Sequence, residues 1–590
     1  MREYGVPAIG AVSAEESLTD MVWANAERFA DAVAFRRRVD GTWIDITTRE
    51  FAAHVLALAK GLIAAGVQPG DRVALMSRTR YEWTLLDFAI WSAGAVTVPV
   101  YETSSAEQVA WILADSGARA VVVEDETHRQ TVESVVDRLG EVVRIWQVEP
   151  GGPACALDEL AAHGAGVSDA DAHQRRRAVG SADLATLVYT SGTTGTPKGV
   201  ELTHANLLAE IRADIAAFPH LLRPGNSMLV FLPLAHVFAR AIALCCVYAR
   251  TTVGHLPDVR TLVADLASFR PTFVVAVPRV FEKVYNSARQ TAHAAGRGRV
   301  FDLAEDAALR YSQALDTGSV PLALRARHLV ADRLVHSRLR GVLGGRCVAA
   351  ISGSAPLGEH LAHFFRGIGV PVYEGYGLTE TSAAVCVNTQ SAFRVGTVGR
   401  PVAGARVRVA DDGEIQLSGP MVTAGYWRGD RTGEWFATGD LGALDSDGYL
   451  RITGRKKELI VTAGGKNVAP AVLEDRVRRH PLVSQCLVVG DRRPFIAALL
   501  TLDPDFAETW ARARGKAVAT LPDDPDLRAE LQTAIDDANA AVSRAESIRA
   551  FVVLPRDFSE EAGEVTPSLK LRRDTILKTY ADTVAAIYEK

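Results

Sequence analysis

The stretch DLATLVYTSGTTGTPKG, residues 183–199, contains the pattern that decides the fold. Its first half, residues 183–190, predicts a buried β-strand. The second half is a loop of glycine, threonine and serine, dense in backbone N–H groups and hydroxyls. Such a loop can cradle phosphate oxygens, and Lys198 adds a compact positive charge. It is not the G-x4-G-K-[ST] loop, because Thr196 follows Gly195. Taken alone, it is equally well interpreted as a surface turn without a ligand.

The segments before this loop alternate between helical and strand patterns. Helices are predicted at residues 49–67 and 81–95, and strands at residues 71–77 and 118–124. Such alternation favours parallel α/β layers. Residues 150–180, rich in Gly, Ala, Asp and Arg, predict a surface connection that leads into the strand before the loop.

The pattern changes twice after the loop. Residues 286–345 are rich in Ala, Arg and Leu and predict an inserted helical hairpin, whereas short strands with glycine turns are predicted at 405–419 and 445–455. The remainder mixes helices and strands and is typical of a compact α+β unit of about 130 residues. The sequence therefore predicts an α/β fold with a large N-terminal domain of several subdomains, residues 1–456, and a small C-terminal α+β domain, residues 457–590.

Composition narrows the classes of function. The 590 residues are 48% hydrophobic and 23% charged, with a net charge of −5, which is ordinary for a globular enzyme. A nucleic-acid-binding role is not expected, because binding to a phosphate backbone needs concentrated positive surface. Any bound anion must therefore be held by a local site. Only ten of the 65 basic residues are Lys, so the positions of these lysines are informative.

The cysteines and the hydropathy pattern indicate the cellular compartment of the protein. The six cysteines lack metal-ligand spacing, and the adjacent Cys245 and Cys246 are interpreted as core side chains. No disulfide framework is implied, which fits a reducing cytoplasm. The first 16 residues have no apolar core, so no secretory signal is expected. The apolar stretch 227–249 is interrupted by Pro, His and Arg and does not fit a bilayer span. Peripheral contact with the inner membrane face stays open.

Five further motifs follow the loop in order. They are SGSAPL (352–357), YEGYGLTE (373–380), TGDLG (438–442), GRKKELIVTAGGKNVAP (454–470) and TPSLKLRR (566–573). Together with YTSGTTGTPKG (189–199), they resemble the adenylate-forming superfamily, which contains acyl-CoA synthetases, luciferases and peptide-synthetase adenylation domains. The resemblance covers nearly the whole chain, and five of the ten lysines lie in three of these motifs. It implies that a carboxylate attacks the α-phosphate of ATP to form an acyl-AMP and pyrophosphate, in the presence of Mg²⁺.

The resemblance assigns the phosphate and metal contacts. It implies that the β- and γ-phosphates are held by Ser191, Gly192, Thr193, Thr194, Gly195 and Lys198. Glu380 is the implied Mg²⁺ ligand, with Thr190 as a weaker candidate beside it, and oxygen ligands are what Mg²⁺ prefers. Thr379 is expected to contact the α-phosphate.

The nucleoside contacts are assigned in the same way. The residues implied to bind the adenine are Gly353, Ser354, Ala355, Pro356, Tyr373, Glu374, Gly375, Tyr376 and Gly377. Tyr376 is placed to stack on the base. Asp440 is expected to accept hydrogen bonds from the ribose hydroxyls, with assistance from Arg455. A carboxylate is a natural partner for a vicinal diol, whereas a plain turn aspartate is the alternative interpretation of TGDLG.

Four more residues take part in the implied reaction. His236, in LPLAHVFAR, matches a histidine near the acyl carboxylate, although a lone histidine in an apolar run also fits a core position. Lys570 matches the C-terminal catalytic lysine that stabilises charge between the carboxylate and the α-phosphate. Lys457 matches a hinge about which the small domain rotates, and Gly464 a glycine that lines the tunnel for the acceptor thiol. A tight turn is the alternative interpretation of Gly464.

The branch of the superfamily is indicated by VPRVFEKVYN (277–286) and the helical insertion, which look like those of long-chain fatty-acyl-CoA synthetases. Coenzyme A is the expected acceptor, since no carrier-domain stretch follows Lys570. The alternatives are a fatty acyl-AMP ligase that delivers to an acyl carrier protein, a medium-chain or aryl-CoA ligase, and a nucleotide sensor that has lost catalysis. Lys198, Glu380, Asp440 and Lys570 are all present, which argues against the sensor. The oligomeric state is left open.

Overall fold

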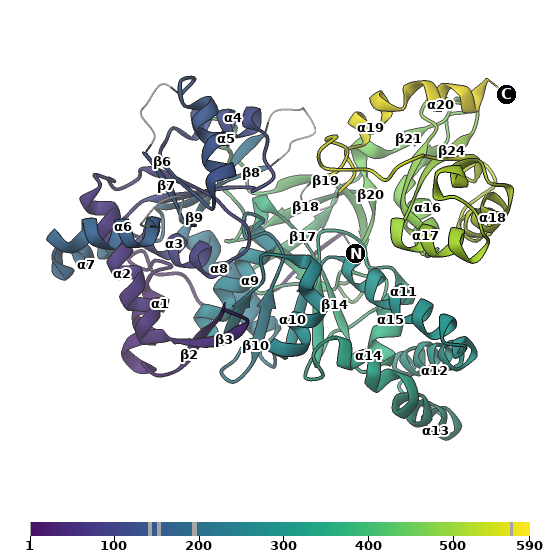
Figure 1. The fold of residues 1–590 in the computed structure, drawn as a ribbon, viewed down its shortest axis with the longest axis horizontal. Coiled ribbons are helices and arrows are strands. Elements are labelled where there is room, and N and C mark those ends of the chain that lie inside the picture. Colours follow the sequence, from purple (N-terminus) through teal and green to yellow (C-terminus); the bar gives the residue numbers. More distant parts are fainter. Residues whose placement is uncertain (1, 140–143, 150–154, 191–196, 567–569, 590) are drawn as a thin grey trace.

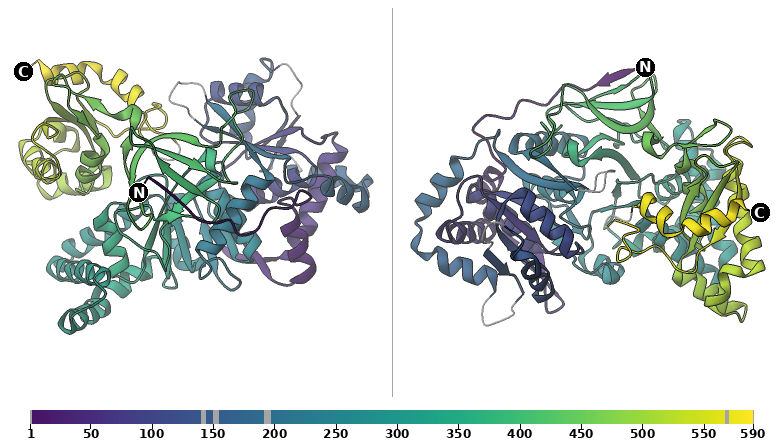
Figure 2. Two further views of the ribbon diagram at one scale, coloured as in Figure 1. Left: turned by 180° about the vertical axis from the view of Figure 1, so that it is seen from behind. Right: turned by 90° about the horizontal axis from the view of Figure 1, so that it is seen from above.

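The structure is a computed structural model that describes residues 2–139, 144–149, 155–190, 197–566 and 570–589. A large α/β body with three sheets is followed in the chain by a smaller α+β unit (Figure 1). Figure 2 shows that this C-terminal unit lies at one end of the large body in both further views. The fold class predicted from the sequence is confirmed.

The first sheet of the large body has six strands in the order β7-β6-β4-β5-β8-β9, and only β9 runs antiparallel to its neighbour. Its strands are β4 (Arg72–Met76), β5 (Val96–Val100), β6 (Ala118–Val123), β7 (Arg144–Gln147), β8 (Leu184–Thr190) and β9 (Lys198–Thr203). Helices in this half are α1 (Asp20–Arg28), α2 (Thr48–Ala64), α3 (Tyr81–Ser92), α4 (Ala106–Ser116) and α5 (Glu126–Val136). The two helices and three strands predicted in this half are confirmed within a few residues.

The second sheet has nine strands in the order β16-β15-β14-β13-β12-β10-β11-β2-β3. They are β2 (Val33–Val39), β3 (Thr42–Thr47), β10 (Ser227–Val230), β11 (Thr252–His255), β12 (Phe273–Ala276), β13 (Ala349–Ser352), β14 (Val372–Leu378), β15 (Ala383–Val387) and β16 (Arg400–Pro401). Its associated helices are α8 (His204–Ala217), α9 (Val237–Ala249), α10 (Leu262–Phe269) and α15 (Glu359–Gly367). Cys245 and Cys246 lie fully buried on α9, as predicted.

The prediction of a plain surface connection at residues 150–180 was wrong. This part contains α6 (Ala156–His163) and α7 (Asp169–Arg177). Ser168 caps α7 by accepting a hydrogen bond from the Asp171 N–H. The composition misled because polar, alanine-rich segments are typical both of loops and of surface helices, and α6 gains its stability by packing on α2.

The predicted insertion is helical but larger than a hairpin. It comprises α11 (Pro278–Ala294), α12 (Gly298–Asp316), α13 (Leu322–Ala331) and α14 (Ser337–Val342), with a π-helical turn between the last two. In Figure 1 these helices project from the lower right of the large body.

The third sheet of the large body is antiparallel. Its strands, in spatial order, are β1 (Glu3–Gly5), β17 (Arg406–Val409), β18 (Glu414–Ser418), β19 (Phe436–Leu444) and β20 (Leu450–Arg455). The TGDLG motif lies within β19 rather than in a turn, so the sequence missed this strand. Its glycines lower the strand propensity and conceal the pattern.

The C-terminal unit has its own hydrophobic core. Its strands are β21 (Ile460–Val461), β22 (Asn467–Val468), β23 (Val483–Val489), β24 (Ile496–Leu502) and β25 (Ile548–Val553). Its helices are α16 (Pro470–Val477), α17 (Pro504–Ala513), α18 (Pro525–Asn539), α19 (Arg573–Thr579) and α20 (Ala581–Tyr588). Across the described part of the whole chain, no helix combines the length and apolar character that crossing a bilayer requires.

Candidate active site

The site forms where β14 meets β15, at the point where the second sheet turns from parallel to antiparallel pairing. The register of the two strands shifts between Tyr376 and Gly377. A Cβ at position 377 would lie 1.6 Å from the carbonyl oxygen of Ala383, so only glycine fits this close approach. A short turn, η4 (Thr379–Thr381), then joins the strands and places the Glu380 carboxylate beside the exit of β14.

Asp440 on β19 is the centre of a buried hydrogen-bond network. Its Oδ2 accepts from the Tyr376 hydroxyl at 2.7 Å, and its Oδ1 accepts from the Arg455 Nε at 2.8 Å. The second contact follows from strand pairing, because Asp440 and Arg455 are direct register partners on β19 and β20. Two motifs that are distant in sequence, YEGYGLTE and GRKKELIVTAGGKNVAP, therefore meet at one carboxylate.

The Asp440 carboxylate keeps capacity for a ligand. An ionised carboxylate offers about four lone-pair positions, and two side-chain donors from the described residues occupy them here. Burial, together with the nearby Asp440 charge, raises the pKa of the Tyr376 phenol well above its usual value. The phenol therefore stays protonated and donates. The free lone pairs can accept the two hydroxyls of a vicinal diol.

A second network surrounds Glu380. Its Oε1 accepts from the Tyr426 hydroxyl at 2.8 Å, and the Lys198 Nζ lies 5.5 Å from the centroid of the Tyr426 ring. The backbone of Trp427 donates to the carbonyl of Gly199 at 2.8 Å, which fixes this tyrosine beside β9. Burial and the Glu380 charge raise the pKa of Tyr426. A carboxylate and an ammonium group thus face the same region, as binding of a metal–phosphate group requires.

The segment after β13 packs against both α9 and β14. A Cβ at Gly353 would touch the Phe238 ring at 3.3 Å, and Ser354 has a positive φ of 72°. At the other end, the Leu357 N–H donates to the Glu374 Oε1 at 3.1 Å. Burial raises the pKa of Glu374 to about 7. These contacts bring SGSAPL to the same side of the sheet as the N-terminus of α9.

His236 caps that helix. Its Nδ1 accepts a hydrogen bond from the Phe238 N–H at 3.2 Å. Burial, followed by the nearby Lys570 charge, lowers the pKa of His236 to about 3, so the ring is neutral near pH 7. Because Nδ1 is an acceptor, the single proton of the neutral ring lies on Nε2. His236 can therefore donate a hydrogen bond to a carboxylate oxygen, whereas it cannot supply a positive charge.

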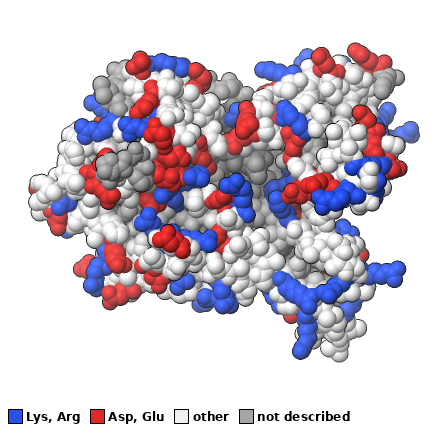
Figure 3. Space-filling view, in the orientation of Figure 1, with Lys and Arg blue, Asp and Glu red and all other residues white. Residues whose placement is uncertain are grey.

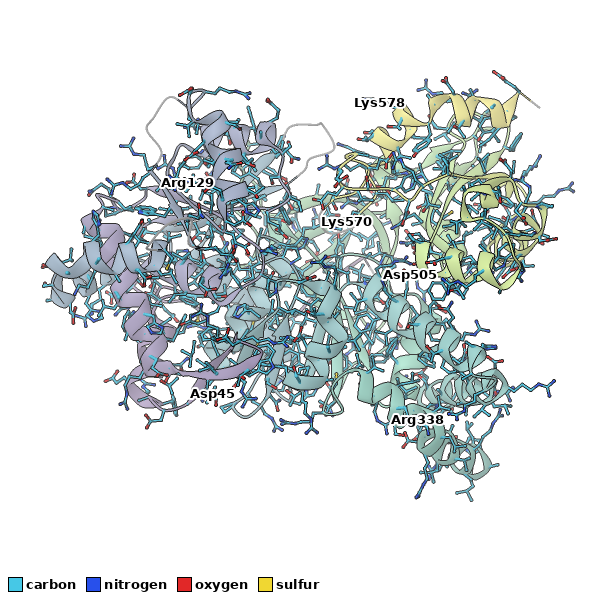
Figure 4. The ribbon with its side chains drawn as sticks, in the orientation of Figure 1. Asp45, Arg129, Arg338, Asp505, Lys570 and Lys578 are labelled. Carbon is cyan, nitrogen blue, oxygen red and sulfur yellow. The ribbon has the colours of Figure 1, made fainter. Side chains whose placement is uncertain are left out.

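Lys570 extends from the C-terminal unit into the same region, and Figure 4 shows it on the side of that unit that faces the large body. Its charge interacts with those of Arg455, Asp440 and Glu380. Desolvation by the surrounding protein, with Arg455 as a like charge, lowers the pKa of Lys570. Its backbone N–H is held by the Thr566 Oγ1 at 3.0 Å.

The position of the C-terminal unit is supported by ion pairs with α11. Arg279 pairs with Asp503 at 2.9 Å, and Lys283 pairs with Asp505 at 3.4 Å. Both basic residues belong to VPRVFEKVYN, and Figure 4 shows Asp505 at the lower edge of the C-terminal unit, above α11. The sequence motif that indicated a branch of the superfamily therefore also seats the lysine-bearing unit.

Comparison with known proteins decides the family. The AMP-binding enzyme family matches residues 22–427, and the family described as AMP-binding enzyme C-terminal domain matches residues 457–590. The chain belongs to the AMP-binding enzyme family. This AMP-binding enzyme is 51% identical to the long-chain-fatty-acid–CoA ligase FadD15 of Mycobacterium bovis over 600 residues, which cover 100% of each chain.

Solved structures agree on the fold. The AMP-binding enzyme resembles the anthranilate CoA ligase AuaEII in complex with anthranoyl-AMP, with a TM-score of 0.73 and 19% identity over 98% of this chain and 99% of the other. It also resembles ATP-bound MatB from Rhodopseudomonas palustris, with a TM-score of 0.69 and 23% identity over 96% of this chain and 100% of the other. At these identities the likeness concerns the arrangement of elements.

Some predicted residues are not gathered at the site. Tyr373 packs in the core, with its ring 5.7 Å from that of Phe218. Lys457 lies in a short turn after β20, and Gly464 in the exposed turn between β21 and β22. Of the glycine loop, Thr190 and Lys198 are register partners across β8 and β9. The predicted contacts Ser191, Gly192, Thr193, Thr194 and Gly195 lie outside the described residues.

Tyr426 and Phe238 are site residues that sequence reasoning missed. Tyr426 lies 46 residues from the Glu380 that it contacts, and no local pattern marks this pairing. Phe238 follows His236 in the apolar run LPLAHVFAR, where an aromatic residue is unremarkable. The spacing of two residues from the helix-capping histidine was the one available signal.

Proposed function

We propose that this AMP-binding enzyme joins a long-chain fatty acid to coenzyme A and converts ATP to AMP and pyrophosphate. The observation that carries the proposal is the approach of Lys570, from the C-terminal unit, to Asp440, Glu380 and His236 of the large body. The identity to FadD15 over the whole chain supports the choice of acid and acceptor.

In the first step, an oxygen of the fatty acid carboxylate bonds to the α-phosphorus of ATP, and the bond from that phosphorus to the bridging oxygen of pyrophosphate breaks. Negative charge concentrates between two anions, so preorganised donors provide most of the stabilisation. We assign Lys570 to the developing charge and the His236 Nε2–H to the carboxylate. Thr379, at the start of η4, is assigned to the α-phosphate.

Nucleotide binding is assigned to three groups of residues. The ribose diol takes the free lone pairs of Asp440, whose Arg455 contact fixes the carboxylate. The adenine is assigned to the segment 353–356 and to the β14 motif with Tyr376. Lys198, with the loop that begins after Thr190, is assigned to the terminal phosphates.

The Glu380 carboxylate fits a Mg²⁺ ion. Mg²⁺ commonly binds one or two protein carboxylates while substrate phosphates and waters fill the other positions. The described residues include no cluster of three His, Cys, Asp or Glu side chains, so a cage made entirely of protein is absent from that part of the chain. When bound, the ion would neutralise phosphate charge, and Glu380 would hold it, with Thr190 as a weaker candidate ligand.

The second step transfers the acyl group. The thiol of coenzyme A attacks the acyl carbonyl of acyl-AMP, the bond to the AMP oxygen breaks, and the thiol proton passes to solvent. One arrangement cannot present Lys570 to ATP and also admit a thiol on the same side. We therefore propose a boundary at Lys457, with a C-terminal domain of residues 457–590 that rotates and brings Gly464 to the site.

The geometry of Gly464 supports this role. Gly465 has a φ of +75° and supplies the left-handed residue of the turn, whereas Gly464 does not lie in that region. A Cβ at Gly464 would approach only the Thr462 Oγ1, at 3.9 Å. Neither backbone strain nor crowding therefore requires a glycine here in the arrangement observed.

A substitution tests the rotation. The Gly464→Leu variant is expected to fold and to release pyrophosphate normally, while consumption of coenzyme A collapses, because leucine would obstruct the thiol path. Gly433→Leu is the matched control, since a Cβ there meets no atom within 4 Å and is likewise uncrowded. Equal loss of both half-reactions in Gly464→Leu would contradict the tunnel assignment.

The overall activity is tested by incubation with fatty acids from acetate to stearate, ATP, Mg²⁺ and coenzyme A. The expected result is acyl-CoA with the highest kcat/KM for long chains. Acyl-AMP without acyl-CoA would indicate delivery to a carrier protein. An optimum at benzoate or a medium-chain acid would indicate a different substrate class, and no product would indicate a sensor.

We also propose a cytoplasmic location with contact at the inner membrane face, supported by the buried thiols and by the surface described next.

A further inference from the structure

Helix α13 and the π-helical turn that follows it, Asp332–His336, present apolar side chains to solvent. The exposed fractions are 80% for Leu322, 69% for Leu329, 60% for Val330 and 51% for Leu334. Leu322 and Leu329 are seven residues apart, so they lie on one face of the helix, and Val330 borders it. A surface helix normally turns this stripe toward the core. The opposite orientation in α13 indicates a surface that another apolar phase covers.

Arginines surround this apolar face. Residues 321–346 contain six arginines and one aspartate, which gives a charge of +5 within a chain of net charge −5. Arg327 and Arg340 are paired with Asp306 and Asp332. Exposed Arg325, Arg333 and Arg338 take part in no ion pair with the described residues. Figure 3 shows blue side chains around a white tip at this end, where Figure 4 labels Arg338.

The surface is held rigidly in this outward orientation. On the inner side of α13, the His328 ring stacks on Tyr311 with centroids 3.9 Å apart, and its Nε2 contacts the carbonyl of Gly367 at 2.6 Å. His336 contacts the carbonyl of Ala304 at 3.0 Å. Polar and aromatic contacts thus anchor the inner face, and the apolar residues are left for an external partner.

We propose that one surface, formed by α13, the π-helical turn after it and the start of α14 and called the α13 face, docks on an anionic phospholipid membrane. Its residues are Leu322, Leu329, Val330, Arg325, Arg333 and Arg338. Leucine and valine side chains enter the boundary between headgroups and acyl chains, and arginines bind lipid phosphates. A second copy of this chain is disfavoured as the partner, because a symmetric contact would bring two surfaces of charge +5 together. The proposal rests on the proposed function in one respect: a long-chain fatty acid dissolves in such a membrane, from which the docked enzyme would receive it.

The test is flotation of the full-length protein, without substrate, with vesicles of phosphatidylcholine alone or mixed with phosphatidylglycerol. Binding is expected only to the mixed vesicles and should weaken at high salt, because salt screens exposed charges. The R325Q/R333Q/R338Q variant should bind on the order of 100-fold more weakly, since each arginine near an anionic surface contributes a factor of about five. The variant L322S/L329S/V330S should also bind more weakly, but its remaining binding should depend on salt in the same way as that of the unchanged protein.

Matched variants control for nonspecific effects. R492Q/R544Q/R549Q removes three exposed arginines from the C-terminal unit, and V259S/V263S removes side chains that are 59% and 57% exposed elsewhere. Both should float like the unchanged protein. Activity on octanoate should be unaltered in every variant, which shows that the fold and the active site are intact. Three results would overturn the proposal. They are equal binding to neutral and mixed vesicles, unchanged binding by both variants of the α13 face, and variants that still float but no longer form a dimer. Vesicle binding is measured without catalysis, so its failure is distinguishable from failure of the proposed activity.

Discussion

Two Arg–Asp pairs in this molecule share their chemistry and differ in their surroundings. Arg240 on α9 and Asp87 on α3 are 3% and 2% exposed, with two hydrogen bonds of 2.8 and 2.6 Å between them. In the active site, Arg455 is 46% exposed and makes one hydrogen bond to Asp440, which is 5% exposed. The first pair joins two layers of the large body, whereas the second lies at the boundary with solvent.

The buried pair is enclosed by protein, which leaves no access for a ligand. Asp87 also accepts from the Thr97 hydroxyl at 2.7 Å, and Arg240 donates to Thr186 at 2.8 Å. Two tryptophan rings enclose the guanidinium, with centroids 5.4 and 5.1 Å away. In the described part of the chain, Asp440 has one side-chain partner on each oxygen, which leaves lone pairs for a ligand. Access to solvent therefore distinguishes a pair that holds the fold from a pair that binds substrate.

The largest expected effect is a difference in the free energy of unfolding between variants of the two aspartates. Asp87→Ala leaves a buried arginine without its counter-ion and should lower the free energy of unfolding by about 3–5 kcal/mol. Asp440→Ala removes a partly exposed ion pair and one hydrogen bond and should cost only about 1–2 kcal/mol. The same Asp440→Ala variant should raise the KM for ATP, measured by pyrophosphate release. Urea unfolding of both variants provides the comparison.

Asp87→Asn is the control, because it keeps the shape and the Thr97 contact while it removes the charge. It should lie between the unchanged protein and Asp87→Ala in stability. Equal destabilisation by the two alanine variants would mean that the site pair also carries the fold, which would contradict the distinction.

The next largest effect is expected for Lys570, whose positive charge faces the Arg455–Asp440 pair. Lys570→Ala should reduce pyrophosphate release by about 10²–10³, the scale for loss of one preorganised donor. The variant should still form thioester from synthetic acyl-AMP and coenzyme A, because the proposed rotation of the C-terminal domain removes Lys570 from the site before that step. Lys578→Ala, an exposed lysine on α19 labelled in Figure 4, is the control and should leave both steps unchanged. Equal loss in both half-reactions would refute the division of labour assigned to Lys570.

The sequence predicted the large-scale fold because hydrophobic periodicity is local. Residues 71–77 and 118–124 are apolar runs bounded by turn signals, and they form β4 and β6 as predicted. The helices within residues 150–180 were missed because their stability comes from packing on α2, which no local pattern reports. The order of the motifs likewise predicted that Asp440, Glu380 and Lys570 belong to one active site.

The contacts inside the site could not be predicted in the same way. Tyr376 reaches Asp440 across 64 residues of sequence, and Tyr426 reaches Glu380 across 46. These pairings depend on how elements that are distant in sequence pack against one another, and that packing is set by the assembled tertiary structure. Arg240 and Asp87, separated by 153 residues, were missed for the same reason. The resemblance identified residue types, whereas the structure supplied the partner of each one.

The smallest expected effect extends the comparison to two histidines. Burial lowers the pKa of both His204 and His236 to about 3, with a minor contribution from Arg240 in one case and Lys570 in the other. His204, 1% exposed, accepts from the Leu18 N–H at 3.2 Å. Like the buried Arg–Asp pair, His204 has only a role in the fold, whereas His236 is assigned to substrate.

The pH dependence of stability follows from His204. Its folded pKa lies below the unfolded value of about 6.5, so below that pH the unfolded chain binds a proton that the folded chain does not. The contribution of His204 to stability is complete above about pH 6.5 and decreases as the pH falls toward its folded pKa of about 3. From about pH 7 to about pH 5, the loss is about 2 kcal/mol. His204→Asn should be less stable at neutral pH but should lose about 2 kcal/mol less over this interval, since asparagine does not titrate. Urea unfolding at both pH values measures the difference, and buried carboxyls elsewhere contribute equally to both proteins. Parallel pH profiles would show that the pKa of His204 is the same in the folded and the unfolded protein, which would contradict the effect assigned to its burial.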